Sequence, residues 1–151
     1  SIELDVPLIV STTGLFLTDT FAFNYLAPKD GNQLDRVNYG SLRFILDNGY
    51  AIEARVQFYL MDSLGMQLDS LLVAPTWIAG GTESADGLTV VPARSILEVP
   101  VNQARLGLME AATEIRLETM LNTTGIDSIH VRSDQKMEFK VVAYLNVSTQ
   151  K

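Results

Sequence analysis

The side chains of this sequence that could do chemistry are one histidine and several small groups of carboxylates. His130 alternates with Ile129 and Val131, so a strand through these residues would turn the imidazole toward its polar face. A Ser-His-Asp site is formally possible, but the sequence contains no Gly-x-Ser-x-Gly turn, and no cysteine is present to share a metal with the histidine. We therefore predict that His130 is a surface or interface residue and that the protein is not an enzyme.

Oxygen-bearing side chains cluster at Asp30, Asn32 and Asp35, and such loops suit calcium. The acidic ligand that closes an EF-hand loop is missing from this cluster. Glu83 and Asp86 form a weaker group beside glycines. We predict turns rather than metal sites at both places, and we expect no cofactor.

Aromatic side chains offer a second kind of chemistry, because sugar rings stack on exposed aromatic faces. Trp77 lies beside a glycine-rich stretch, while Tyr59 and Tyr144 are out of phase with their apolar neighbours and should point outward. These three residues are a candidate ligand platform, although outward aromatics also stabilise cross-strand pairs. Asn122 and Asn146 each begin the Asn-x-Ser/Thr pattern of a glycosylation acceptor.

The elements that must position these residues are strands, because apolar and polar side chains alternate with a period of two along most of the chain. A half-buried strand produces this period, since successive side chains point to opposite faces of a sheet. The alternation is clearest near the end of the chain, where one face would carry Met137, Phe139, Val141, Ala143, Leu145 and Val147. Val142 interrupts the polar face of the same strand.

The first segment alternates in the same way, and it contains a proline that favours an edge strand or a bulge. Its apolar face would be formed by Ile2, Leu4, Val6, Leu8 and Val10. Such a segment can pair within its own sheet, or it can be exchanged and pair with the edge of another copy. These five residues are our candidate self-assembly strand.

Three glycines mark the connections between strands. A two-residue hairpin at Asn48-Gly49 would place a charge on the apolar face, so we expect a longer loop or a crossover to a second sheet. Gly65 suits the positive φ of a bulged turn. One short helix is expected between residues 102 and 112, weakened by Gly107.

Composition limits the class of protein. Apolar residues make up 47% of the 151 residues and charged residues 19%, as in a folded domain. A net charge of −7 argues against nucleic-acid binding, which needs a concentrated basic face. No run of apolar residues is long enough for a membrane-spanning helix, and the absence of cysteine excludes disulfides. We expect one domain covering residues 1–151, with residues 1–10 as the exchangeable strand.

The stretch from residue 37 to 68 resembles the central hairpin of LEA-type and immunoglobulin-like β-sandwich domains of exported bacterial surface proteins. In those domains a strand ending in Asn-Gly-aromatic, here residues 48–50, precedes a strand that runs into an Asp-x-x-Gly turn, here residues 62–65. Residues 4–8 and 17–20 are similar to segments of secreted proteins of the Bacteroidetes group. The resemblance implies a non-catalytic, exported sandwich domain.

We therefore predict an antiparallel, immunoglobulin-like β-sandwich with Greek-key connections, about eight or nine strands and at most one short helix. The predicted function is that of a structural or adhesive subunit of an extracellular fibre or cell-surface assembly. Its partners would be copies of itself or neighbouring surface domains. The alternative is a glycan- or lipid-binding module of a larger surface protein.

Overall fold

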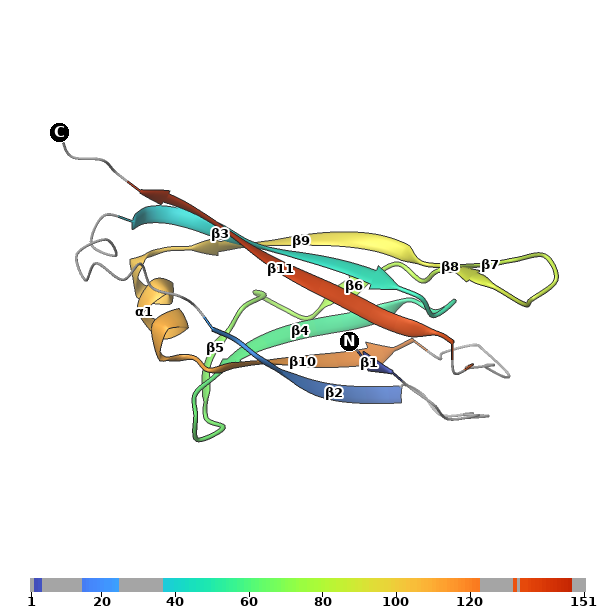
Figure 1. Cartoon of the computed structure of the whole chain (residues 1–151), viewed down its shortest axis with the longest axis horizontal. Coiled ribbons are helices and arrows are strands. Elements are labelled where there is room, and N and C mark those ends of the chain that lie inside the picture. The colour runs from blue at the N-terminus through green and yellow to red at the C-terminus, as the bar shows by residue number, and fades with distance from the viewer. Residues whose placement is uncertain (1, 4–14, 25–36, 123–131, 133, 148–151) are drawn as a thin grey trace.

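The computed structural model describes residues 2–3, 15–24, 37–122, 132 and 134–147. Two antiparallel sheets lie face to face with the hydrophobic core between them (Figure 1). The first sheet contains, in spatial order, β1 (Ile2–Glu3), β11 (Lys136–Val147), β3 (Val37–Asn48) and β9 (Ala93–Val101). The second contains β2 (Leu15–Ala22), β10 (Glu114–Leu121), β4 (Ala54–Met61) and β5 (Gln67–Ser70), with β6 (Thr76–Ile78) also beside β4.

Two further elements lie at opposite ends of the sandwich (Figure 1). The helix α1 (Gln103–Ala111) joins β9 to β10 at one end. The hairpin of β7 (Thr82–Glu83) and β8 (Val90–Val91) projects from the other. Among the described residues no helix is long and apolar enough to cross a membrane.

The strand order is that of a jelly roll. If β5 and β6 are counted as one strand and the β7–β8 hairpin is left out, the sandwich has eight strands in chain order. In this count the first sheet holds the first, eighth, third and sixth strands, in spatial order. The second holds the second, seventh, fourth and fifth. This connectivity winds two Greek keys into one sandwich. The predicted antiparallel Greek-key sandwich with one short helix is confirmed, and its connectivity differs from the immunoglobulin order because every pair of successive strands except the fourth and fifth lies in different sheets.

The core is built from the alternating positions that the sequence marks as apolar. On β3 the inward residues Leu42, Phe44 and Leu46 are almost fully buried. The Phe44 ring stacks on Phe58 of β4 with centroids 4.1 Å apart. Inward residues of the two central strands of the second sheet, β4 and β10, are equally buried. The core is therefore densest between β3, β4 and β10.

The chain crosses between the sheets directly after Asn48. β3 ends at this residue in the first sheet and β4 begins at Ala54 in the second, so the crossover alternative is confirmed. The fully buried Asn48 amide donates to the carbonyls of Ile52 (2.9 Å) and Ala79 (3.0 Å), and its Oδ1 accepts the Tyr50 amide N–H (3.0 Å). One side chain thus fixes the crossover and the end of β6.

The predicted turn at Gly65 and the predicted short helix are also confirmed. Gly65 has φ +75° in the turn between β4 and β5, a backbone conformation that residues with a Cβ atom rarely adopt. Gly107 lies in the middle of α1. The helix is capped by Asn102, whose side chain accepts the Arg105 amide N–H at 2.8 Å.

The helix is tied to the second sheet by an ion pair. Arg105 Nε donates to Asp69 Oδ2 at 2.6 Å, and another guanidinium nitrogen donates to the Pro100 carbonyl at 2.8 Å. Leu106 and Met109 point into the core beneath it. The helix therefore closes one end of the sandwich.

Candidate functional site

The outer edge of β11 is open over most of its length. One side of the strand pairs with β3 along its whole length, and the other side pairs only at Lys136 and Met137, opposite β1. Within the described residues no strand pairs with the outer edge from Glu138 to Val147. We call this stretch the open edge. Unpaired N–H and C=O groups along it can accept another strand.

β1 pairs only with the first two residues of β11, at the end of the strand before the open edge begins. Ile2 lies opposite Met137 and Glu3 opposite Lys136 in an antiparallel pair. A strand continued from Glu3 in this register moves past the start of β11, away from the open edge. In this register β1 therefore does not extend along the open edge.

The side chains along the open edge that face the core are apolar and incompletely covered. Phe139 and Val141 are half-buried, and Ala143 is exposed although it lies on the inward face. Across the gap, Phe21 of β2 meets Phe139 edge-on with ring centroids 4.4 Å apart. A cavity of about 330 Å³ opens beside this pair and is lined mainly by apolar side chains that include Phe23. We call this strip between β2 and β11 the seam.

The other long edge strands are protected against pairing, and β11 is not. β2 carries Asp19 on its inward face, in register with Leu117, and an inward charge on an edge strand opposes the addition of another strand. β9 carries Pro100, which has no N–H to donate. The inward positions of the open edge have neither a charge nor a proline. The open edge is therefore the described edge best suited to accept a strand.

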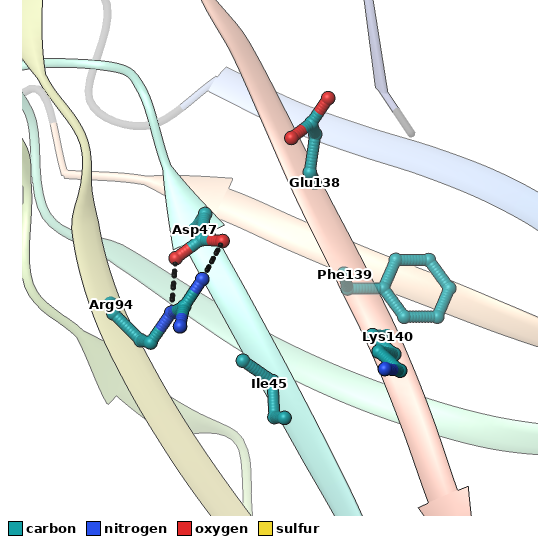
Figure 2. Close-up of a pocket in the computed structure, with 6 residues that line it drawn as sticks. All are labelled: Ile45, Asp47, Arg94, Glu138, Phe139 and Lys140. Atoms are coloured by element: carbon teal, nitrogen blue, oxygen red, sulfur yellow. Dashed lines mark hydrogen bonds and ion pairs between the residues drawn. The ribbon is translucent and has the colours of Figure 1, made fainter.

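The outer face of the first sheet carries two ion pairs that both join β3 to β9. Asp47 and Arg94 share two hydrogen bonds of 2.8 Å (Figure 2). Two rows further along, Arg43 donates to Glu98 at 2.9 Å and 2.5 Å. The Arg94 guanidinium lowers the pKa of the Asp47 carboxyl, and Glu98 raises the pKa of Arg43 through the corresponding hydrogen bonds.

Apolar side chains separate these two ion pairs. Ile45 of β3 and Ile96 of β9 are directly opposite one another in the row between them. Ile96 is 55% exposed and Ile45 is half-buried, so this row presents apolar surface to solvent. A depression of about 450 Å³ adjoins Ile45 and is also lined by Glu138 and Lys140 of β11 (Figure 2). We call the two ion pairs with their central isoleucines the charge ladder.

The candidate ligand platform does not form one surface. Tyr59 and Trp77 lie on the outer face of the second sheet, and Tyr144 lies on the outer face of the first. Each ring has a guanidinium over it at 4.9 to 5.7 Å: Arg43 over Tyr144, Arg116 over Tyr59 and Arg55 over Trp77. Burial and the neighbouring Glu118 raise the pKa of Tyr59. The rings therefore belong to local cation–π pairs on two opposite faces.

Several predicted positions lie outside the described residues: His130, Asp30, Asn32, Asp35, Leu4, Val6, Leu8 and Val10. Glu83 and Asp86 belong to the β7–β8 hairpin, where Asp86 accepts the Leu88 amide N–H at 3.0 Å and the Ser84 hydroxyl. The Ser84 hydrogen bond lowers the pKa of Asp86. Within the described part of the chain no three acidic or histidine side chains gather as metal ligands.

The two glycosylation-pattern asparagines have different surroundings. Asn122 follows β10 and is half-buried, and its backbone N–H donates to the Glu53 carbonyl at 2.9 Å. Asn146 is exposed on β11 and donates to the Tyr39 hydroxyl at 3.1 Å. Asn146 is therefore the more exposed of the two.

No family model and no curated protein matches this sequence. Among solved structures, the chain is similar to "Structure of infectious bursal disease virus Gx strain", with 13% identity over 92% of this chain and a TM-score of 0.38. It is also similar to "Crystal structure of infectious bursal disease virus VP2 subviral particle", with 15% identity over 99% of this chain and a TM-score of 0.35. The chain spans about a third of the first of those chains (33%) and 41% of the second, and similarity at these scores carries no functional argument.

Proposed function

We propose that this protein is a non-catalytic structural subunit that assembles with copies of itself by accepting a strand at the open edge of β11. We place the assembly outside the cell or on its surface, as a fibre or coat. The observation that carries the proposal is an unprotected strand edge above an apolar seam that the described residues leave partly uncovered. The acidic net charge of −7 would keep free subunits soluble.

Strand addition at the open edge would satisfy two needs at once. Backbone N–H and C=O groups of β11 would gain partners, and alternate side chains of the added strand would enter the seam beside Phe139 and Val141. Three aliphatic side chains buried there contribute roughly 5–8 kcal/mol. Association costs roughly 4–15 kcal/mol, so both the backbone pairing and the side-chain burial are needed.

The strand that we propose for this role is the first segment of a second copy. Its apolar alternation, from Ile2 to Val10, has the period that a seam between two sheets requires. The pairing of Ile2 and Glu3 with the start of β11 in the same chain supports the proposal, because it is a contact of the first segment with that strand. The first segment of a second copy would make the same antiparallel contact further along β11, on the open edge.

The test is a charge placed in the seam. Ala143 is exposed and faces inward, so Ala143→Lys should leave the monomer folded while placing an ammonium group where an apolar side chain of the added strand would lie. Ala111→Lys, at the exposed end of α1, is the matched control. Sedimentation velocity and negative-stain electron microscopy would follow the oligomers of each protein over a range of concentrations.

We expect wild type and Ala111→Lys to form a ladder of oligomers, and Ala143→Lys to lose the longer species. Deletion of residues 1–10 should give the same loss, with near-UV circular dichroism as the check on folding. The proposal fails if folded Ala143→Lys assembles like wild type. It also fails if the wild type stays monomeric at every concentration.

A further inference from the structure

The two ion pairs of the charge ladder point in opposite directions. On β3 the acidic partner is Asp47 and the basic partner is Arg43, and on β9 the order is reversed, with basic Arg94 and acidic Glu98. The register pairs Asp47 with Arg94, Ile45 with Ile96, and Arg43 with Glu98. The charges therefore change sign on passing from one side of the isoleucine row to the other.

This reversal is what a two-fold axis requires of a self-complementary face. A rotation about an axis that lies along the Ile45–Ile96 row brings the row of Asp47 in one copy over the row of Arg43 in the other. Asp47 then faces Arg43 of the second copy, and Arg94 faces Glu98. Each contact occurs twice, so four opposite-charge contacts surround a centre made of isoleucines.

We infer that the outer face of the first sheet is a docking surface for a second copy of this chain, which it binds as a two-fold symmetric dimer. Ile96 is 55% exposed and Ile45 is half-buried, and each would pack against its own symmetry mate. Paired sheets of this kind lie about 10 Å apart, and side chains of both fill the space between them. The depression beside Ile45 gives the facing isoleucine room to enter.

β11 forms the rim of this surface. Lys140 lies in the isoleucine row and would meet its symmetry mate, which opposes the dimer. Its long side chain is at the sheet edge, where the ammonium group can turn into solvent. Val142 lies in the row of Arg43, on the outward face of β11, which is otherwise mainly polar, and it would be covered in the dimer.

The size of the surface sets the expected strength of the dimer. Three strands spaced about 4.8 Å apart and about nine residues long give a footprint of roughly 400–500 Å² per copy. This is below the roughly 800 Å² per partner of a stable complex, so the dimer should be weak and in rapid exchange. Its contacts are exposed ion pairs, so added salt should weaken it further.

The inference does not depend on strand addition, because the charge ladder and the seam lie on different sides of β11. The test exchanges the two charges of one ion pair. Asp47→Arg with Arg94→Asp keeps the pair within the chain and the net charge, but it makes both pairs point the same way. In the dimer Arg43 would then face an arginine and Glu98 an aspartate.

We expect this double variant to weaken dimerisation at least about tenfold in sedimentation equilibrium, because four contacts change from attraction to repulsion. Adding Arg43→Glu with Glu98→Arg reverses the second pair and should restore the dimer. Exchange of Arg116 and Glu118, an ion pair on the outer face of the second sheet, is the matched control and should leave dimerisation unchanged. The measurements are made in the Ala143→Lys background, so that strand addition does not contribute.

The restored dimer in the four-residue variant is the decisive result, because a merely structural effect of the first exchange would not be reversed by the second. The inference is overturned if the double variant dimerises like its parent. It is also overturned if the folded four-residue variant stays as weak as the double variant, or if the Ala143→Lys parent stays monomeric at hundreds of micromolar protein in low salt.

Discussion

Replacing Asn48 by alanine should destabilise the sandwich by about 3 kcal/mol, because the side-chain amide of Asn48 ties the crossover between the sheets to the end of β6. It makes three hydrogen bonds of 2.9 to 3.0 Å to backbone groups of Ile52, Ala79 and Tyr50, and it is fully buried. Each bond contributes about 1 kcal/mol net, and its loss leaves a buried backbone group without that partner. For a domain of this length the loss corresponds to a decrease in Tm of roughly 6–12 °C.

Urea denaturation followed by Trp77 fluorescence, together with thermal unfolding, would measure this change. Asn146→Ala is the control, since it removes a single exposed hydrogen bond to Tyr39 and should change the free energy of unfolding by less than about 0.5 kcal/mol. Asn48→Asp should cost more than Asn48→Ala at neutral pH, because its carboxylate would face two carbonyl oxygens. If Asn48→Ala and Asn146→Ala proved equally stable, the role that we assign to the buried amide would be wrong.

Three further outcomes are expected. Gly107→Ala should stabilise the protein by about 0.5–1 kcal/mol, because Gly107 lies in the middle of α1 and an added Cβ there meets nothing within 4 Å. Gly65→Ala should destabilise the protein by about 1 kcal/mol, because Gly65 has φ +75°. Chemical denaturation measures both changes. Gln57→Glu should increase amide hydrogen exchange at residues 71–72. The buried Gln57 amide donates to the Leu72 carbonyl at 3.0 Å, and a glutamate carboxylate cannot donate this hydrogen bond. Arg94 lowers the pKa of Asp47 in the folded state, so the ion pair stabilises the fold above about pH 4. This stabilisation is lost as the pH falls through the folded-state pKa of Asp47. The difference in the free energy of unfolding between wild type and Arg94→Gln should therefore shrink toward pH 2.

The period of two predicts the strands and their buried faces well because it is a local property of the sequence. The inward residues Leu42, Phe44 and Leu46 are buried as their spacing predicts. The jelly-roll order does not follow from such spacing, since it depends on which strands pair. Gly49 shows the difference, because its N–H donates to the Lys136 carbonyl, which is distant in sequence.

The charge ladder was not predicted, although its signal is present in the sequence. Arg43 and Asp47 are two residues either side of Ile45, and β9 carries the same order, basic then acidic, around its own isoleucine, so the antiparallel pairing sets opposite charges side by side. Only the pairing of β3 with β9 makes these two patterns adjacent, and no rule of local spacing provides that register. The platform of Trp77 and Tyr144 fails for the same reason, since the two rings fall on different sheets.

The two proposed contacts have different symmetry, and this gives their combination a distinctive outcome. The charge ladder is self-complementary, so it closes after two copies. Strand addition joins the first segment of one copy to the open edge of the next, so it is heterologous and can continue without closing. Wild type should therefore form chains whose subunits are also joined in pairs. Ala143→Lys should leave dimers, the Asp47 and Arg94 exchange should leave unbranched single chains, and the combined variant should be a monomer. If the Asp47 and Arg94 exchange alone gave monomers, the two contacts would not be independent, and the separation of the seam from the charge ladder would be refuted.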